Sequence, residues 1–106
     1  LNAESFAEAA QALAKRVWTE KELKDDAARL TRAFSLCVAR APRAEELQSL
    51  TKLLQESRYT YQNGSAEEAK AACGLHAAPD VPAAENAAWV AVTRIILNLD
   101  EVITRD

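Results

Sequence analysis

The sequence contains few of the residues that interrupt helices. Glycine occurs twice and proline three times in 106 residues, whereas alanine is the most frequent apolar residue. Alanine has the highest intrinsic helix propensity, and strands favour Val, Ile, Thr and aromatic residues instead. The composition therefore predicts an all-α fold.

Methionine is absent, and the chain begins with Leu1-Asn2. Translation starts at methionine, and removal of that methionine requires a small second residue. We therefore expect this single domain, residues 1–106, to be the C-terminal fragment of a longer protein. The lack of a signal peptide in the fragment then carries no information about the parent protein.

The sequence also lacks a concentration of positive charge. Its 13 basic residues are scattered among 16 acidic ones, and the net charge is −3. Nucleic-acid-binding domains carry a basic stripe, and binders of anionic membranes cluster Lys and Arg. We expect neither a nucleic-acid partner nor membrane insertion. The nearest approach to a basic patch is interrupted by acids, which indicates a solvated face of mixed charge. It comprises Arg29, Arg32, Arg40 and Arg43, interspersed with Asp25, Asp26, Glu45 and Glu46.

Apolar residues recur at three- and four-residue steps in five segments, which predicts five helices. These cover residues 3–19, 25 to the Arg40-Ala41-Pro42 step, 44–61, 65–74 and 82–104. Asn2 and Ser65 are predicted N-caps, Gly74 a C-terminal stop, and Pro82 a first-turn residue. The last segment is the most apolar and is predicted to be central, with Trp18 and Trp89 as the largest core side chains. The predicted fold is a compact bundle of four main helices plus one short helix.

Metal-binding and redox residues are scarce. His76 is the sole histidine, and Cys73-x-x-His76 forms at most half of a zinc site, to which Cys37 adds a third ligand where four are needed. The Cys-x-x-Cys-His motif of covalent haem attachment is absent. We expect no metal and no cofactor in this domain.

Two interpretations of the cysteines stay open. Cys37 and Cys73 both fall at inward-leaning helical positions, where buried thiols are common. If the parent is exported, a disulfide between them would close a loop of ~35 residues and stabilise the fold by ~3–4 kcal/mol.

Polar residues interrupt the otherwise apolar last segment at Asn98, Asp100 and Glu101. One interpretation is a carboxylate pair for acid–base chemistry. We favour the other, in which Asn98 hydrogen-bonds a neighbouring helix and the acids meet polar partners. The candidate partners are Arg40, Arg58, Tyr61 and Arg94. No catalytic residue is therefore expected.

Both ends of the chain carry motifs of a known family. The opening Leu1-Asn2, followed by Phe6 and Glu8-Ala9-Ala10, resembles the opening of a planctomycete domain of unknown function. Ala88-Trp89 and the run from Asn98 to Arg105 match its ending, in which Asn98, Asp100 and Glu101 belong to the signature. The centre also matches, at Ala33-Phe34, Arg40-Ala41-Pro42 and Glu45-Glu46-Leu47. The chain departs from the family at Arg43, where a capping Thr is usual, at Val102, where Phe is usual, and at Val81-Pro82, where Asp-Pro is usual.

The resemblance implies where the domain lies in its parent protein and where that protein is located, and it implies no activity. Such domains end large exported proteins, many of which carry a cytochrome-c-like haem domain near the N-terminus. The parent would then be periplasmic or extracellular, and haem would belong to another of its domains. We expect a structural or interaction module that packs on the rest of its own chain or on a partner protein. The alternatives are an accessory domain of a haem-containing oxidoreductase and glycan binding through Trp18, Tyr59, Tyr61 or Trp89.

Overall fold

The computed structural model describes residues 3–104, with the side chains of residues 4–75 and 77–99. The elements are α1 (Ala3–Thr19), α2 (Asp26–Val38), α3 (Ala44–Gln62), α4 (Ala66–Cys73), a 3₁₀ turn η1 (Gly74–His76) and α5 (Ala83–Thr104). No strand occurs between residues 3 and 104. The predicted all-α fold is confirmed. The predicted Asn2 cap lies outside the described residues.

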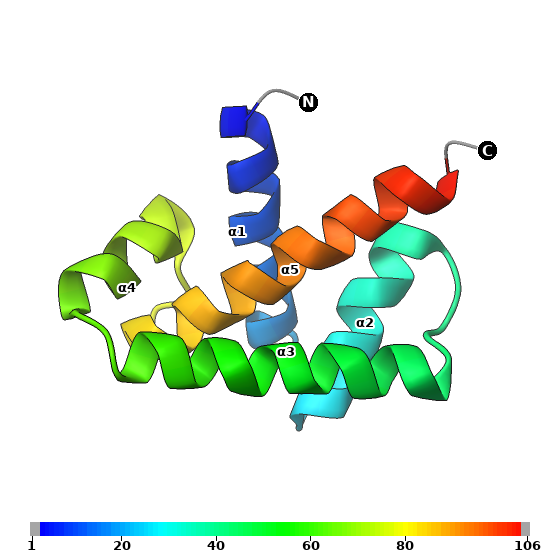
Figure 1. Ribbon diagram of the computed structural model, residues 1–106, viewed down its shortest axis with the longest axis horizontal. Coiled ribbons are helices and arrows are strands. Elements are labelled where there is room, and N and C mark those ends of the chain that lie inside the picture. The colour runs from blue at the N-terminus through cyan, green and yellow to red at the C-terminus, as the bar shows by residue number, and fades with distance from the viewer. Residues whose placement is uncertain (1–2, 105–106) are drawn as a thin grey trace.

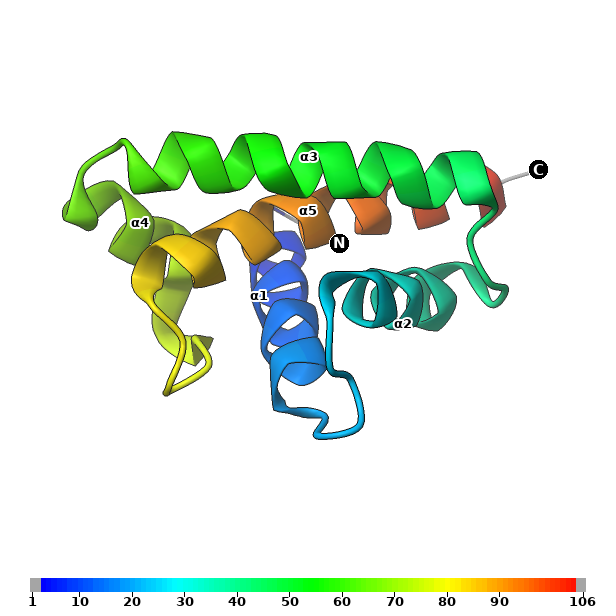
Figure 2. The same ribbon diagram turned by 90° about the horizontal axis from the view of Figure 1, so that it is seen from below.

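Helix α5 is the centre of the fold. It packs against each of the other four α-helices. In Figure 1 it crosses in front of α1 and passes the upper end of α2, while α3 runs along one side. Seen from below, α5 lies between α3 and the α1–α2 pair, and α4 covers the N-terminal end of α5 (Figure 2). The Cα radius of gyration is 13.0 Å, as expected for a compact domain of about 100 residues.

The core is built around Trp89, which is fully buried. The ring of Trp18 meets it edge to face, with 6.1 Å between ring centroids and 86° between planes. Trp18 itself is only half-buried, so of the two predicted anchors Trp89 alone lies wholly inside. The other large, fully buried apolar residues are Phe34, Leu30, Leu54, Ile96, Val17 and Val92.

Helices α1 and α5 are joined by a buried hydrogen bond. Thr93 Oγ1 donates to the carbonyl of Ala10 at 2.8 Å, and both residues are fully buried. A buried hydroxyl without a partner would be costly, so this bond favours one register of the two helices. None of the described helices has the length and apolarity needed to cross a lipid bilayer.

Local side chains explain where the helices begin. Asp25 Oδ1 accepts from the Ala28 N–H at 2.8 Å at the start of α2, and Ser65 Oγ accepts from the Glu68 N–H at 3.1 Å at the start of α4. The predicted Ser65 cap is therefore confirmed. At α3 the capping position holds Arg43, whose backbone N–H donates to Glu46 Oε1 at 2.8 Å.

The end of α2 and the start of α5 differ from the prediction in ways that the local structure explains. Helix α2 ends at Val38, before the Arg40-Ala41-Pro42 step, because Ala39 adopts a left-handed conformation with φ of 65° and its N–H bonds the Ser35 carbonyl at 3.0 Å. Helix α5 begins at Ala83, one residue after the predicted Pro82. The Pro82 carbonyl accepts from the Asn86 N–H at 3.0 Å, so Pro82 precedes the helix and caps it.

The connection between η1 and α5 is held by a buried amide. Asn86 is 3% exposed; its Oδ1 accepts from the Ala78 N–H at 3.1 Å and its Nδ2 donates to the Val81 carbonyl at 2.9 Å. At the start of this connection Gly74 has φ of 68°, as predicted for a residue that stops α4. The loop is therefore tied to the first turn of α5.

The left-handed Ala39 leads to a stability prediction. A Cβ in this conformation costs about 1 kcal/mol, which glycine avoids. We expect Ala39→Gly to raise the free energy of unfolding by roughly 0.5–1 kcal/mol, measured by urea denaturation. The matched control is Ala12→Gly at an exposed position inside α1, which should lower it by about 1 kcal/mol. Destabilisation by both substitutions would contradict the assigned end of α2.

Candidate functional site

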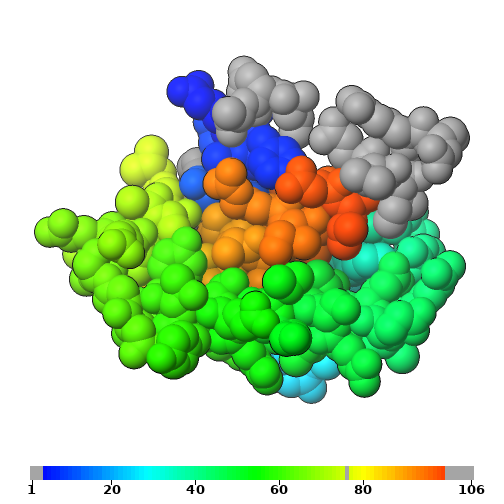
Figure 3. Space-filling view, viewed as in Figure 1, coloured from blue at the N-terminus to red at the C-terminus, as the bar shows by residue number. Residues whose placement is uncertain are grey.

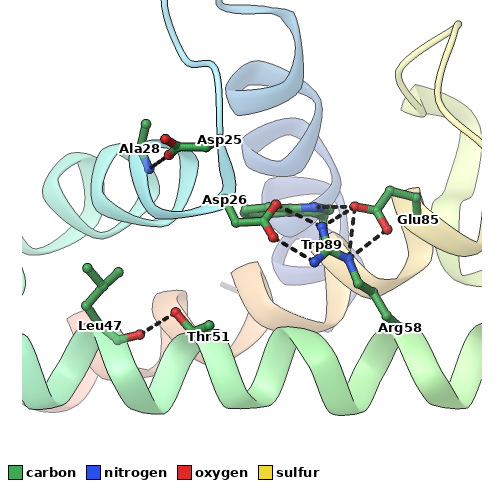
Figure 4. Close-up of polar contacts among 8 residues, drawn as sticks. All are labelled: Asp25, Asp26, Ala28, Leu47, Thr51, Arg58, Glu85 and Trp89. Atoms are coloured by element: carbon green, nitrogen blue, oxygen red, sulfur yellow. Dashed lines mark hydrogen bonds and ion pairs between the residues drawn. The ribbon is translucent and has the colours of Figure 1, made fainter.

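The most concentrated group of charged side chains joins three helices around Arg58 of α3. Its Nη1 and Nη2 donate to the two carboxylate oxygens of Asp26, the first residue of α2, at 2.7 and 2.8 Å. Its Nε donates to Glu85 Oε1 in the first turn of α5 at 2.9 Å. Figure 4 shows the guanidinium group held between the two carboxylates. Bidentate pairing of this kind is both strong and geometrically specific.

The same network positions the central indole. Trp89 lies one turn after Glu85 on α5, and its Nε1 donates to Glu85 Oε2 at 3.1 Å (Figure 4). The largest core side chain therefore has its one polar atom satisfied by a carboxylate that Arg58 also neutralises. We define Asp26, Arg58, Glu85 and Trp89 as the Arg58 network.

The electrostatics of the Arg58 network favour a structural role. Hydrogen bonds from Arg58 lower the pKa of Asp26, although partial burial opposes the change. The two carboxylates in turn raise the pKa of Arg58, chiefly through their hydrogen bonds. A general acid or base works best with a pKa near the operating pH. Asp26 and Arg58 are instead held in their charged forms, as expected for an ion pair that fixes packing.

Two of the arginines proposed as partners have partners elsewhere in the described part of the chain. Arg58 binds Asp26 and Glu85, and Arg40 binds Glu46 with oxygen distances of 2.8 and 3.0 Å. Asn98 is exposed and bonds no described residue, because it lies on an uncovered side of α5. The predicted hydrogen bond from Asn98 to a neighbouring helix is therefore wrong. The side chains of Asp100 and Glu101 lie outside the described residues.

The two cysteines lie in different parts of the core. Cys73 is a buried thiol that donates to the Ala83 carbonyl at 3.1 Å in a small cluster between α4 and α5. Burial raises the pKa of the Cys73 thiol. Cys37 packs on the main cluster from α2. The disulfide considered from the sequence is thus not formed in this structure.

A metal site is also not assembled by the described side chains. Among them, no group of three or more His, Cys, Asp or Glu residues is close enough to hold an ion. The side chain of His76, the proposed partner of Cys73 in a zinc half-site, lies outside the described residues.

The expected mixed-charge face is more ordered than a solvated surface. Arg32 and Arg16 both bind Glu20, each with 3.0 Å from Nε to a carboxylate oxygen. Arg29 stacks on Trp18, with 3.9 Å from Cζ to the ring centroid. Such cation–π contacts contribute about 0.5–2 kcal/mol. The N–H groups at Trp18 Nε1 and Arg29 Nε are buried without a partner among the described residues.

Two concave surfaces flank α5. A groove of about 320 Å³ lies between α2, α3 and α5, where Phe34, Leu50 and Leu53 face Ile95 and Leu99. A second cleft, of about 390 Å³, lies between α3, α4 and α5. It is lined by Tyr61, Ala72, Val90, Ala91, Arg94, Ile95 and Asn98. We call this second concavity the Arg94 cleft.

The glycan-binding alternative loses its largest aromatic side chain. Trp89 is fully buried, and Trp18 is half-buried under Arg29. Tyr59, at 71% exposure, is the most exposed of the aromatic residues named for that alternative. A stacking platform of several aromatic rings is not formed at the surface by these residues.

The Arg58 network yields a prediction about stability. Arg58→Met leaves the carboxylates of Asp26 and Glu85 without their cation, so we expect a loss of about 2–3 kcal/mol in unfolding free energy. This is less than the roughly 3–5 kcal/mol of a fully buried pair, since the side chain of Asp26 is 38% exposed. The control is Arg16→Met, which breaks the exposed pair with Glu20 just after the end of α1 and should change stability by less than about 0.5 kcal/mol. If urea denaturation shows the same loss of unfolding free energy for Arg58→Met and Arg16→Met, the Arg58 network does not stabilise the fold as proposed.

Two arginine-paired carboxylates, Asp26 and Glu46, predict acid sensitivity. The pKa of Asp26 is lowered from 3.8, and that of Glu46 falls from 4.5 to about 2, chiefly through the Arg40 hydrogen bonds. A lowered folded-state pKa stabilises the fold above the unfolded-state pKa, and this contribution is lost as pH falls through the folded value. We expect stability to decline from pH 4.5 towards about 2.

Asp26→Asn tests this pH dependence. It should lower stability at pH 7 and flatten the decline below pH 4. The control, Asp80→Asn, removes an exposed loop carboxylate and should change stability at pH 7 by less than about 0.5 kcal/mol. Urea denaturation between pH 7 and 2 measures the slope for Asp26→Asn and the stability of both variants at pH 7. If the slope of unfolding free energy against pH is the same in Asp26→Asn as in the original sequence, the Asp26 carboxylate does not cause the loss of stability in acid.

Comparison with known proteins does not extend the assignment. No protein-family model, no curated protein and no solved structure matches the chain. The resemblance to the planctomycete domain therefore stays a prediction from the residues that carry it. Any function has to be argued from the geometry described above.

Proposed function

We propose that this domain is a helical structural and interaction module without a catalytic site of its own, which packs on the rest of a longer chain or on a partner protein. We further propose that the longer chain is an exported planctomycete protein that this domain ends. The second statement depends on the resemblance at Phe6, Trp89 and the segment from Asn98.

The main support is that the clustered charges of the described residues are used within the fold. Arg58 pairs with both Asp26 and Glu85, and Glu85 also accepts the Trp89 N–H. The buried amide of Asn86 and the buried hydroxyl of Thr93 are likewise bound to backbone groups. An active site would need such groups directed at a substrate.

A second support is the incomplete cover of the central helix. Atoms of α5 are visible between α3, α4 and α1 in Figure 3. Ala91 and Ile95 are half-buried there, and Arg94 and Asn98 are exposed. A central helix with an uncovered side offers a rigid surface to another protein, since side chains on packed helices are already held in place.

Binding of the domain to the remainder of the parent protein tests the proposal. The two parts are prepared separately, and their affinity is measured by calorimetry. We expect binding that Ala91→Arg weakens by about tenfold or more, because a large charged side chain would fill the uncovered side of α5. Ala71→Arg, at an exposed position on α4, is the matched control and should bind like the original sequence.

Three outcomes separate the alternatives. Loss of binding in Ala91→Arg with intact helicity supports an interaction module. Absence of any binding, or equal weakening by Ala71→Arg, contradicts it. If removal of residues 1–106 slows haem reduction while the parent still assembles, the domain is an accessory of an oxidoreductase instead.

A further inference from the structure

The Arg94 cleft presents hydrogen-bond donors from two helices to one space. Arg94 and Asn98 are four residues apart on α5 and so lie on one face, and Tyr61 of α3 lines the same cleft. A guanidinium group donates only, while a phenol and an amide can each donate one or more hydrogen bonds. No carboxylate lines the cleft among the described side chains. The cleft therefore suits a ligand group that accepts hydrogen bonds and carries negative charge.

Arg94 contacts no carboxylate among the described side chains. Arg16, Arg32, Arg40 and Arg58 each bind a carboxylate, and Arg29 stacks on Trp18. Arg94 lies beside the ring of Phe6, with 6.0 Å between Cζ and the ring centroid. That distance is at the outer limit of a cation–π interaction, so among the described side chains the N–H groups of Arg94 are not taken up by an acceptor.

The rest of the cleft is small and apolar. Ala72 of α4 and Val90, Ala91 and Ile95 of α5 line it beside the polar residues. Val90 is 6% exposed, and Ala72, Ala91 and Ile95 are half-buried. A short aliphatic stem would bury apolar surface here while its charged end reaches Arg94.

We propose that the Arg94 cleft binds a carboxylate carried on a short aliphatic stem, as in a glutamyl side chain of an acidic peptide segment. Arg94 binds the carboxylate, Tyr61 and Asn98 supply further hydrogen bonds, and Ala91 and Ile95 contact the stem. This inference rests on the proposed interaction module and names the chemistry of its partner. Polyanions such as nucleic acids are disfavoured, because the cleft holds one cation and the chain has a net charge of −3.

Titration of the domain, followed by amide chemical shifts, tests the proposal. The probes are a blocked Ala-Glu-Ala peptide, the same peptide with Gln in place of Glu, and glutarate. We expect saturable shifts around Tyr61, Ala72 and residues 90–98 with the Glu peptide, and binding at least about tenfold weaker with the Gln peptide. Arg94→Gln should weaken binding of the Glu peptide by a similar factor. The control is Arg43→Gln, at an exposed arginine that lines neither the cleft nor the groove. This variant should bind the Glu peptide with an affinity within about twofold of that of the original sequence.

The outcomes are distinct. Equal binding of the Glu and Gln peptides, unchanged binding in Arg94→Gln, or no saturable shift would each overturn the proposal. Binding of glutarate as tight as that of the Glu peptide would keep the carboxylate site and identify a small dicarboxylate as its ligand. If the domain binds the remainder of the parent protein but shows no saturable shift with the peptides, the interaction surface lies elsewhere on the domain. The proposed function would then hold, and this inference would not.

Discussion

The ion pairs of Arg58 are the constraint on which the arrangement of α2, α3 and α5 depends. One guanidinium group reaches a carboxylate at the start of α2 and another in the first turn of α5, so the three helices share a single fixed point. Desolvating these charges is costly, and only correct geometry compensates for it. Because Glu85 also accepts from Trp89, the fixed point sets the position of the largest core side chain. Apolar packing supplies most of the stability, and the polar network selects one packing among several.

Smaller polar contacts fix the remaining elements to α5. Thr93 binds the Ala10 carbonyl and ties α1 to the middle of the helix. Asn86 binds both the N–H and the carbonyl of Ala78, which holds the connection from η1 against the start of α5. Thr93 and Asn86 therefore act between elements, where apolar side chains give little directional information.

This use of polar groups is the reason for which we propose a binding role rather than a catalytic one. Acids and bases that bind one another are not available to a substrate, and the described thiol of Cys73 donates to a backbone carbonyl. The surface around Arg94 is the contrasting case, because its donors meet no carboxylate among the described side chains. A rigid set of helices with an uncovered donor-rich cleft is a good scaffold for recognition, since little conformational entropy is lost on binding.

Local features of the sequence determined which segments form helices and which helix lies at the centre. Apolar residues at helical spacing, the Ser65 cap and the stop at Gly74 act within a few residues, so the chain itself specifies them. The end of α2 escaped prediction because alanine rarely adopts the left-handed conformation that Ala39 takes. In the sequence, only the position of Arg58 on the apolar side of its predicted helix indicated a buried ion pair. Its partners Asp26 and Glu85, 32 and 27 residues away, were decided only by the tertiary structure, because contacts between distant residues depend on how the helices cross. The same holds for the Arg94 cleft, whose lining comes from three helices that no local pattern brings together.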